Sequence, residues 1–163
     1  MKYCEITTKG HPLSLNHKTC LEIIDQIIIR EGGNSRLFGT NSVALNLDMV
    51  ERSHRPHQMQ STVDFCFGVS QNLKNRQIVL TELRLRVNNP KTIKKSDLVD
   101  KVNGSINLLS REIPIYKEFY FIFKNDQKEV ARSHFRLLFY NKPNTPYIPL
   151  KLNDLHALFF SNS

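Results

Sequence analysis

Residues 61–87 read STVDFCFGVSQNLKNRQIVLTELRLRV, a pattern that predicts two β-strands joined by a polar turn. The first strand covers residues 62–69 and the second covers residues 77–87. Each strand carries one acid among apolar neighbours, Asp64 in the first and Glu82 in the second. An acid inside an apolar strand is costly unless a cation or a metal compensates its charge. Two such acids on facing strands therefore call for a joint explanation.

The register of this hairpin decides which side chains share a face. An antiparallel pairing about a turn near Leu73 places Asp64 opposite Glu82 and Phe67 opposite Val79. One face is then a continuous apolar surface made by Val63, Phe65, Phe67, Val69, Val79, Leu83, Leu85 and Val87. The other face holds Asp64, Cys66, Glu82, Arg84 and Arg86. A slip of one residue would separate the two sets, so this register is the central assumption.

Length and composition indicate one globular domain over residues 1–163. The net charge of +8 favours an acidic partner such as nucleic acid, with a merely basic surface as the alternative. The three cysteines lack CxxC spacing and are typical of reduced cytosolic thiols. No stretch has the length and apolarity of a membrane span, and the N-terminus lacks the apolar core of a signal peptide. We therefore expect a cytoplasmic protein that does not enter a membrane.

The remaining elements follow from hydrophobic periodicity and from helix start and stop signals. Helices are predicted over 17–30, 96–110, 126–139 and 153–160, and strands over 42–48 and 116–124. A hairpin strand is the competing prediction for 126–139. Loops are predicted over 34–40, 51–60 and 141–149, and a further element can be hidden in 52–60 or after Pro143. The order predicts an α/β fold with a central mixed sheet, an antiparallel hairpin meander followed by a crossover strand, flanked by helices.

This order, with Asp64 on the second strand and Glu82-Leu83-Arg84 on the third, resembles the PD-(D/E)xK nuclease superfamily. The resemblance covers the order of elements from about residue 15 to residue 139, although the motif itself is only a few residues long. It implies the restriction-endonuclease-like fold and a Mg²⁺-dependent phosphodiester hydrolase. It also implies that Asp64 and Glu82 bind the metal, with Glu22 as the acid that some members carry on the first helix. Such nucleases often dimerise, so a homodimer is compatible with the resemblance.

Arg84 stands where the family has a lysine two residues after the glutamate. An arginine stays cationic and cannot act as a base, but it can hold a phosphate or stabilise charge. Lys101, or else Lys95, is a candidate to replace the missing lysine. The predicted catalytic set is therefore Asp64, Glu82, Arg84 and Lys101, and the predicted nucleic-acid contacts are Arg76, Arg86, Lys91, Lys94 and Lys95.

Two alternatives stay open at the level of sequence. Asp64 and Glu82 can pair with Arg84 and Arg86 as a cross-strand charge cluster without catalysis. The protein would then be an inactive binding module of the same fold, such as an immunity protein that neutralises a bacterial toxin. A separate pair of histidines, His54 and His57 in HRPH, could reach a metal, although proline-containing loops with histidine are common.

Overall fold

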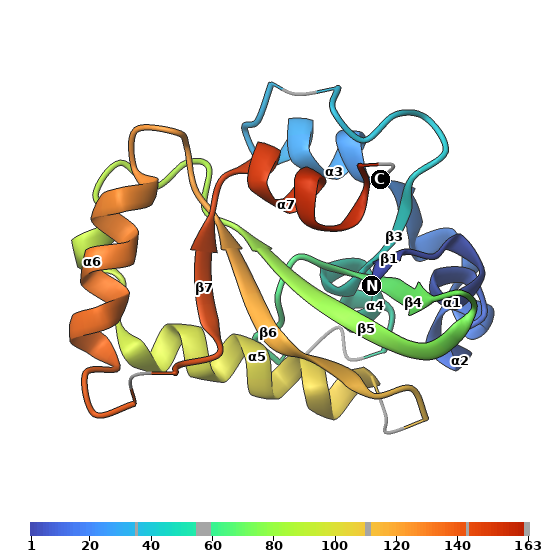
Figure 1. Ribbon diagram of the computed structural model, residues 1–163. Helices are drawn as coiled ribbons and strands as arrows, with labels where there is room; N and C mark the ends of the chain where they lie inside the picture. Colours follow the sequence, from blue (N-terminus) through green and yellow to red (C-terminus); the bar gives the residue numbers. More distant parts are fainter. Residues whose placement is uncertain (35, 55–59, 110–111, 143, 162–163) are drawn as a thin grey trace.

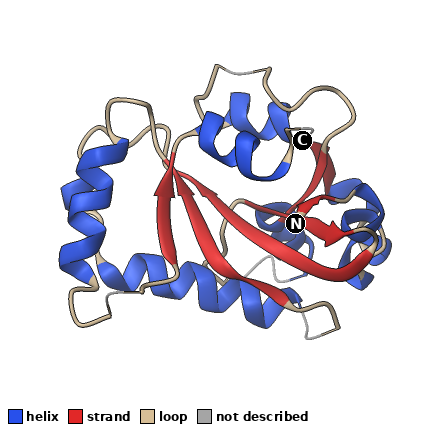
Figure 2. Ribbon diagram, viewed as in Figure 1, coloured by secondary structure: helices blue, strands red, loops and turns tan. Residues whose placement is uncertain are grey.

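The structure is a computed structural model that describes residues 1–34, 36–54, 60–109, 112–142 and 144–161. Within these residues the fold is mixed α/β, with a seven-stranded sheet between helices (Figure 1, Figure 2). The strands are β1 Lys2–Tyr3, β2 Leu21–Ile23, β3 Val43–Asn46, β4 Phe65–Gln71, β5 Lys74–Leu83, β6 Ile115–Ile122 and β7 Tyr147–Leu150. The α-helices are α1 Glu5–Lys9, α2 Pro12–Asn16, α3 Ile24–Arg30, α4 Leu47–His54, α5 Lys95–Leu109, α6 Lys128–Leu138 and α7 Leu152–Phe159. Two 3₁₀ helices complete the set, η1 Lys18–Cys20 and η2 Pro90–Thr92.

The sheet is antiparallel in its first part and parallel in its second. Its strand order is β2-β3-β4-β5-β6-β7, and β1 pairs with β4 outside this path. Neighbouring strands from β2 to β5 are antiparallel, whereas β5, β6 and β7 are parallel. Parallel neighbours need a crossover, and α5 and α6 provide the two that the sheet requires. The predicted mixed sheet with a meander and a crossover strand is therefore confirmed.

Helices cover both faces of the sheet, so the core has two halves. One half packs α3 and α7 against Phe65, Phe67 and Val79. The other packs α4, α5 and α6 against the opposite face, which includes Cys66 and Leu80. Figure 1 shows α3 and α7 together on one side of the sheet and α5 on the other. Among the described residues, no helix has both the length and the apolarity needed to cross a membrane.

The predicted hairpin register is confirmed. Phe67 lies opposite Val79 and Phe65 opposite Thr81, so the next pair in the same register is Asp64 and Glu82. The prediction of a single apolar face was wrong, because Cys66 and Leu80 on the acid-bearing face are buried too. Val63 also packs in that second half of the core. The reason is that β4 and β5 are central strands with helices on both faces.

The helix predicted over residues 17–30 was wrong in its first half. Residues 18–23 form η1 and then β2, which pairs antiparallel with β3, and the helix begins only at Ile24. Pairing with β3 satisfies the backbone of Leu21–Ile23, and this tertiary contact overrides the helical spacing of the apolar residues. Asn16, just before the predicted helix, is the last residue of α2. The predicted end at residue 30 is confirmed, because α3 ends at Arg30, and Gly32 just after it has a positive φ of 87°.

Two further elements replace predicted loops. The strand predicted over 42–48 ends at Asn46, and α4 takes in residues 47–54, four of which were predicted to be loop. Of the rest of that loop prediction, residues 55–59 lie outside the described residues. The stretch after Pro143 contains β7, which pairs with β6. The predicted elements over 96–110, 116–124, 126–139 and 153–160 correspond to α5, β6, α6 and α7, and the hairpin alternative for 126–139 was wrong.

Gly104 lies inside α5 because the chain approaches the helix closely there. A Cβ atom at this position would overlap the backbone carbonyl oxygen of Ser61, three residues before Asp64. The close approach brings residues 61–63 onto α5, where Val63 N donates to Ser105 Oγ at 2.9 Å. The glycine therefore serves the geometry of the segment that precedes Asp64.

We expect Gly104→Ala to destabilise the protein by about 1–3 kcal/mol, because overpacking against backbone cannot be relieved by a rotamer change. In an ordinary helix the same change would stabilise by about 1 kcal/mol, so the sign is diagnostic. Urea denaturation measures the difference. The control is Asn103→Ala, at an exposed neighbour, which should change stability by less than about 0.5 kcal/mol. A stabilised Gly104→Ala would show that the close approach is absent.

Candidate carboxylate site

The two acids predicted from the hairpin meet where β4 begins and β5 ends. Asp64 directly precedes β4, and Glu82 is the penultimate residue of β5. The backbone N–H of Leu83 donates to Asp64 Oδ2 at 2.5 Å, which holds the Asp64 carboxylate against β5. Glu82 is only 2% exposed. The site is therefore built into the central strands rather than into a surface loop.

Two cations lie against the buried Glu82. Arg84 Nε is 3.0 Å from Glu82 Oε1, and Lys101 Nζ is 3.1 Å from Glu82 Oε2. Lys101 reaches the site from α5 and also donates to the carbonyl oxygen of Thr62 at 2.8 Å. The distances are those of ion pairs, but within the described residues Glu82 Oε2 and Arg84 Nε have no partner with hydrogen-bond geometry. The four residues predicted as catalytic are thus brought together.

The two cations do not offset the cost of burying the carboxylates. Burial raises the pKa of Glu82 to about 8, and the neighbouring Asp64 adds to this rise, while Lys101 and Arg84 oppose it. Burial also raises the pKa of Asp64 to about 6, against the opposing effects of the Leu83 N–H and Lys101. Near neutral pH, Glu82 therefore binds a proton readily. A further cation that took the place of this proton would stabilise the ionised Glu82 carboxylate.

A pocket of about 280 Å³ opens beside Asp64. It is lined by Ile27, Arg30, Glu31, Asn46, Asp48, Met49, Arg52 and Asp64. Asp48, in the first turn of α4, accepts a hydrogen bond from Thr62 Oγ1 at 3.2 Å and contributes to the raised pKa of Asp64. Asp48 and Glu31 were not among the predicted site residues. Their signal was weak, since Asp48 ends an apolar stretch next to the key hairpin and Glu31 follows a helix.

Glu22, the predicted first-helix acid, lies on β2 and is engaged elsewhere. Its carboxylate forms a two-pronged ion pair with Arg30, at 2.9 and 2.7 Å, and accepts from Asn46 Nδ2 at 2.6 Å. Arg30 holds the pKa of Glu22 below its usual range. Glu22 is not among the residues that line the Asp64 pocket, but its partners Arg30 and Asn46 are. Its place in the structure is therefore to orient two residues of the pocket wall.

The five predicted nucleic-acid contacts do not gather around the acids. Arg86 Nη2 donates to the carbonyl oxygen of Arg30, so this side chain lies at the end of α3. Arg76 is near the hairpin turn, six residues before Glu82 on the same strand. Lys91, Lys94 and Lys95 lie on or between η2 and the start of α5, and Lys95 Nζ is 5.1 Å from the centre of the Phe139 ring. Lys95, the other candidate for the missing lysine, is thus turned toward the end of α6.

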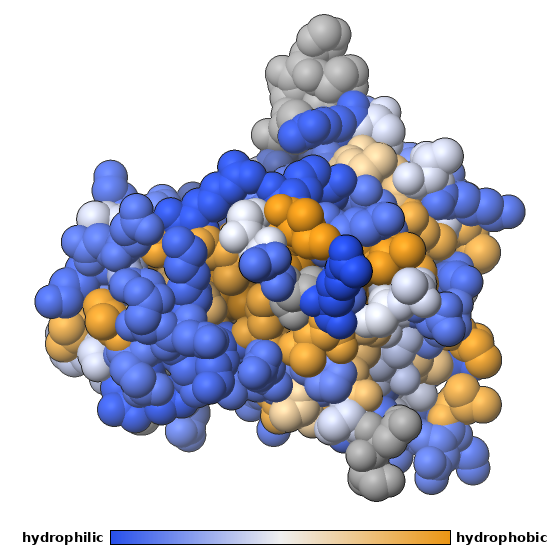
Figure 3. Space-filling model, turned by 90° about the horizontal axis from the view of Figure 1, so that it is seen from above, coloured by the Kyte–Doolittle hydropathy of each residue, from blue (hydrophilic) through white to orange (hydrophobic). Residues whose placement is uncertain are grey.

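Hydrophilic residues gather at the α6 end of the face shown in Figure 3, with hydrophobic residues nearer its centre.

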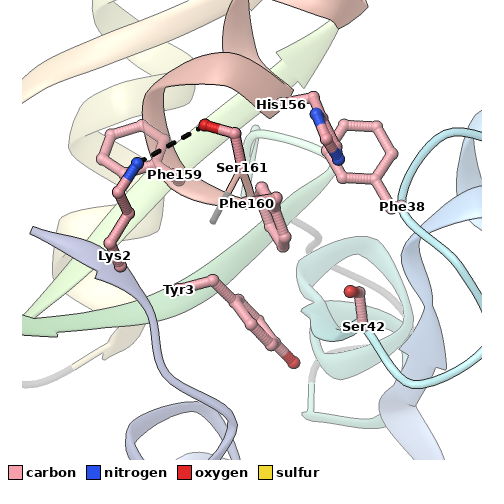
Figure 4. A pocket seen from close by; sticks show the side chains of 8 residues that line it. All are labelled: Lys2, Tyr3, Phe38, Ser42, His156, Phe159, Phe160 and Ser161. Atoms are coloured by element: carbon pink, nitrogen blue, oxygen red, sulfur yellow. Dashed lines mark hydrogen bonds between the residues drawn. The ribbon is translucent and has the colours of Figure 1, made fainter. Parts of the chain in front are cut away.

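A second cavity, of about 410 Å³, lies between β1, the loop before β3 and the end of α7. Figure 4 shows Tyr3, Phe38, His156 and Phe160 around it, with Lys2 Nζ donating to Ser161 Oγ at 3.5 Å. Tyr3 and Phe160 stack on each other with ring centres 4.7 Å apart. This cavity contains none of the predicted site residues.

The donor set at the carboxylate site suits a hard divalent cation only in part. Among the described residues, no group of three His, Cys, Asp or Glu side chains lies close enough to hold one metal ion. Asp64 and Glu82 supply carboxylate oxygens, the ligands that Mg²⁺ prefers, and Mg²⁺ commonly uses one or two carboxylates with waters and phosphate. The buried Glu82 Oε2 lacks a full hydrogen bond, but Lys101 Nζ lies 3.1 Å from it, so a metal bound there would compete with Lys101. The pair therefore fits Mg²⁺ but does not form an all-protein cage.

Comparisons with known proteins leave the site to be interpreted from its geometry. No protein-family model, no curated protein and no solved structure matches this chain.

The raised pKa of Glu82 predicts a pH-dependent stability in the absence of metal. The folded pKa is about 8 and the ordinary value is 4.5, so between these values the folded protein holds a proton that the unfolded chain has released. We therefore expect the melting temperature of the protein in EDTA to fall as pH rises from about 5 to about 8. Glu82→Gln has no such proton and should show a smaller fall.

Glu129→Gln is the matched control, because Glu129 is largely exposed on α6 and should leave the slope of wild type unchanged. A Glu82→Gln slope equal to that of wild type would contradict the raised pKa of Glu82.

Proposed function

We propose that the protein is a PD-(D/E)xK-like phosphodiester hydrolase acting on nucleic acid, in which Lys101 takes the role of the absent lysine. The observation that carries this proposal is the contact of Lys101 Nζ with Glu82 Oε2 at 3.1 Å. The motif position after Glu82 holds Arg84, yet a lysine from α5 reaches the same carboxylate. Lys101, the acid pair and the pocket beside Asp64 then lie at one end of the central strands.

The topology agrees with a restriction-endonuclease-like fold. From α3 onward the elements run α3, β3, α4, β4, β5, η2, α5 and β6. The helix, three strands, helix, strand order expected from the resemblance is present, with α4 inserted between the first two of these strands. β3, β4 and β5 form an antiparallel meander, and α5 leads to β6, which is parallel to β5. The acids fall at the second and third strands of this set. Support for the fold assignment comes from this order and from the position of the acids within it.

The residues divide the chemistry between them. Asp64 and Glu82 would hold Mg²⁺, which when bound supplies Lewis-acid activation of a phosphodiester and of water. Lys101 carries a donor that can reach both the acid pair and the adjoining backbone, so it can position water or contribute charge to the transition state. Arg84 remains cationic and can neutralise charge on the phosphate. The backbone N–H of Leu83 keeps the Asp64 carboxylate oriented.

The pocket beside Asp64 supports a polyanionic substrate. Arg30 and Arg52 line it together with Asp64, and Arg30 is also paired with Glu22. The net charge of +8 favours association with a phosphate backbone over the whole surface. Substrate would therefore enter past α4 and the end of α3. Asp48 and Glu31 also line the pocket beside Asp64, and a divalent cation would offset their charge as a phosphate approached.

The second candidate is an inactive binding module of the same fold, for example one that neutralises a bacterial toxin. The observation in its favour is that both oxygens of Glu82 already face a cation, Arg84 on one side and Lys101 on the other. Such an arrangement can hold a buried acid without metal. In this candidate function the carboxylate cluster stabilises the end of β5, and a protein partner binds elsewhere.

Metal binding and cleavage distinguish the two functions. We expect the wild type to bind Mg²⁺ or Mn²⁺ in calorimetry and to cleave plasmid DNA or RNA in a metal-dependent manner. Asp64→Asn and Glu82→Gln should each reduce cleavage by at least about 100-fold, since each removes a negatively charged ligand. Asp100→Asn, at an exposed acid on α5, should cleave as wild type does. Absence of both metal binding and cleavage would instead favour the binding module.

Lys101 can be tested separately from the metal ligands. We expect Lys101→Met to abolish most cleavage while metal binding is retained, because the lysine acts on the reacting groups and competes with the metal for Glu82. Lys117→Met, at an exposed position of β6, is the charge-matched control. Cleavage at the wild-type rate by Lys101→Met would show that Lys101 only neutralises Glu82.

A further inference from the structure

Two histidines meet at a corner of the molecule that has no part in the proposed hydrolase chemistry. His17 lies between α2 and η1, and His54 is the last residue of α4. Their Nε2 atoms are 3.0 Å apart and their ring centres are 4.6 Å apart. His54 is exposed and His17 is partly exposed, so solvent ions can reach the pair.

Ser53 determines which nitrogen of His17 carries the proton. Ser53 Oγ donates its single proton to the carbonyl oxygen of Val50 at 2.8 Å. The same oxygen is 3.3 Å from His17 Nδ1, and it can only accept there, so Nδ1 is the protonated nitrogen of a neutral His17. The lone pair of His17 is then on Nε2, the atom that faces His54. An outer hydrogen bond that fixes the tautomer and orientation of an imidazole in this way is typical of metal-binding histidines.

The spacing of the two nitrogens is close to that required by a shared metal ion. Zinc binds imidazole nitrogen at about 2.0–2.1 Å, so tetrahedral coordination separates two such nitrogens by about 3.3 Å. The observed 3.0 Å needs only a small rotation of the exposed His54 ring to reach this value. In the metal-free protein the two Nε2 atoms lie within hydrogen-bond distance. To bind a metal ion together with His17, neutral His54 would carry its proton on Nδ1, which leaves the lone pair of its Nε2 free for the metal.

We propose that His17 and His54 form a binding site for a divalent transition-metal ion of the zinc, nickel and copper class. Imidazole nitrogen suits these ions, whereas Mg²⁺ prefers oxygen ligands, so the site is chemically distinct from the Asp64–Glu82 pair. Two protein ligands leave further positions for water or for an external ligand. The ion joins the end of α4 to the corner between α2 and η1, and thereby ties together two segments that are far apart in sequence.

Calorimetric titration of the full chain with Zn²⁺ tests this proposal, with excess Mg²⁺ present and in an Asp64→Asn background that disables the carboxylate site. We expect one zinc ion per chain, and loss of that binding in His17→Ala and in His54→Ala. His156→Ala removes a histidine of α7 beside the aromatic cavity and should bind zinc as the parent does. Circular dichroism establishes that each variant is folded.

Cu²⁺ provides a spectroscopic readout of the ligands themselves. Electron paramagnetic resonance of the copper-loaded chain should show two coordinating imidazole nitrogens, and one fewer in either alanine variant. The proposal is overturned if the parent binds no zinc or if zinc binding survives both substitutions. It is also overturned if the copper signal is the same in the parent and the variants, because the histidine contact would then be a simple hydrogen bond.

Discussion

Burial of the Glu82 carboxylate at the end of β5 is the constraint around which the local structure is arranged. A carboxylate that is 2% exposed needs compensating charge, and the structure supplies it from two directions. Arg84 directly follows β5 and Lys101 comes from α5, so the position of α5 against the sheet is linked to the charge of one buried acid. The close approach at Gly104 brings residues 61–63 to the same helix, and Asp64 follows directly.

The charges around Glu82 are compatible with both the hydrolase and the inactive module. The choice between these functions depends on how well the cations compensate the buried acids, and the sequence motif alone does not decide it. The two cations against Glu82 reduce the cost of burying its charge, and an inactive module could hold the acid in this way. Yet the pKa of Glu82 stays raised to about 8 because desolvation and the Asp64 carboxylate outweigh the cations. A buried Glu82 that retains its proton near neutral pH has an unmet preference for positive charge. A divalent ion would meet this preference, and for this reason we propose the hydrolase ahead of the inactive module.

The hairpin was the most predictable part of the protein. Its register followed from the alternation of Phe65, Phe67 and Val79 and from the turn chemistry around Leu73, where Asn72 and Leu73 adopt positive φ values. That register was enough to place Asp64 opposite Glu82. Lys101 was selected only as one of two lysines near the start of α5. Nothing in the local pattern could decide between Lys95 and Lys101, because both occupy polar positions of an amphipathic helix, and only the packing of α5 against the sheet separates them.

The sequence by itself determined the α/β class, the central hairpin with its facing acids, and the main helices and strands after it, because these depend on local periodicity and short-range pairing. Only the tertiary structure decided that Leu21–Ile23 is a strand, since β3 must be beside it to satisfy its backbone. The tertiary structure also decided the partner of Glu22, which pairs with Arg30 and does not lie with Asp64. Tertiary packing also places Asp48 in the lining of the pocket and brings His17 into contact with His54. Such contacts join residues that are distant in sequence, and their distances are set by how helices pack on a sheet, which no local pattern encodes.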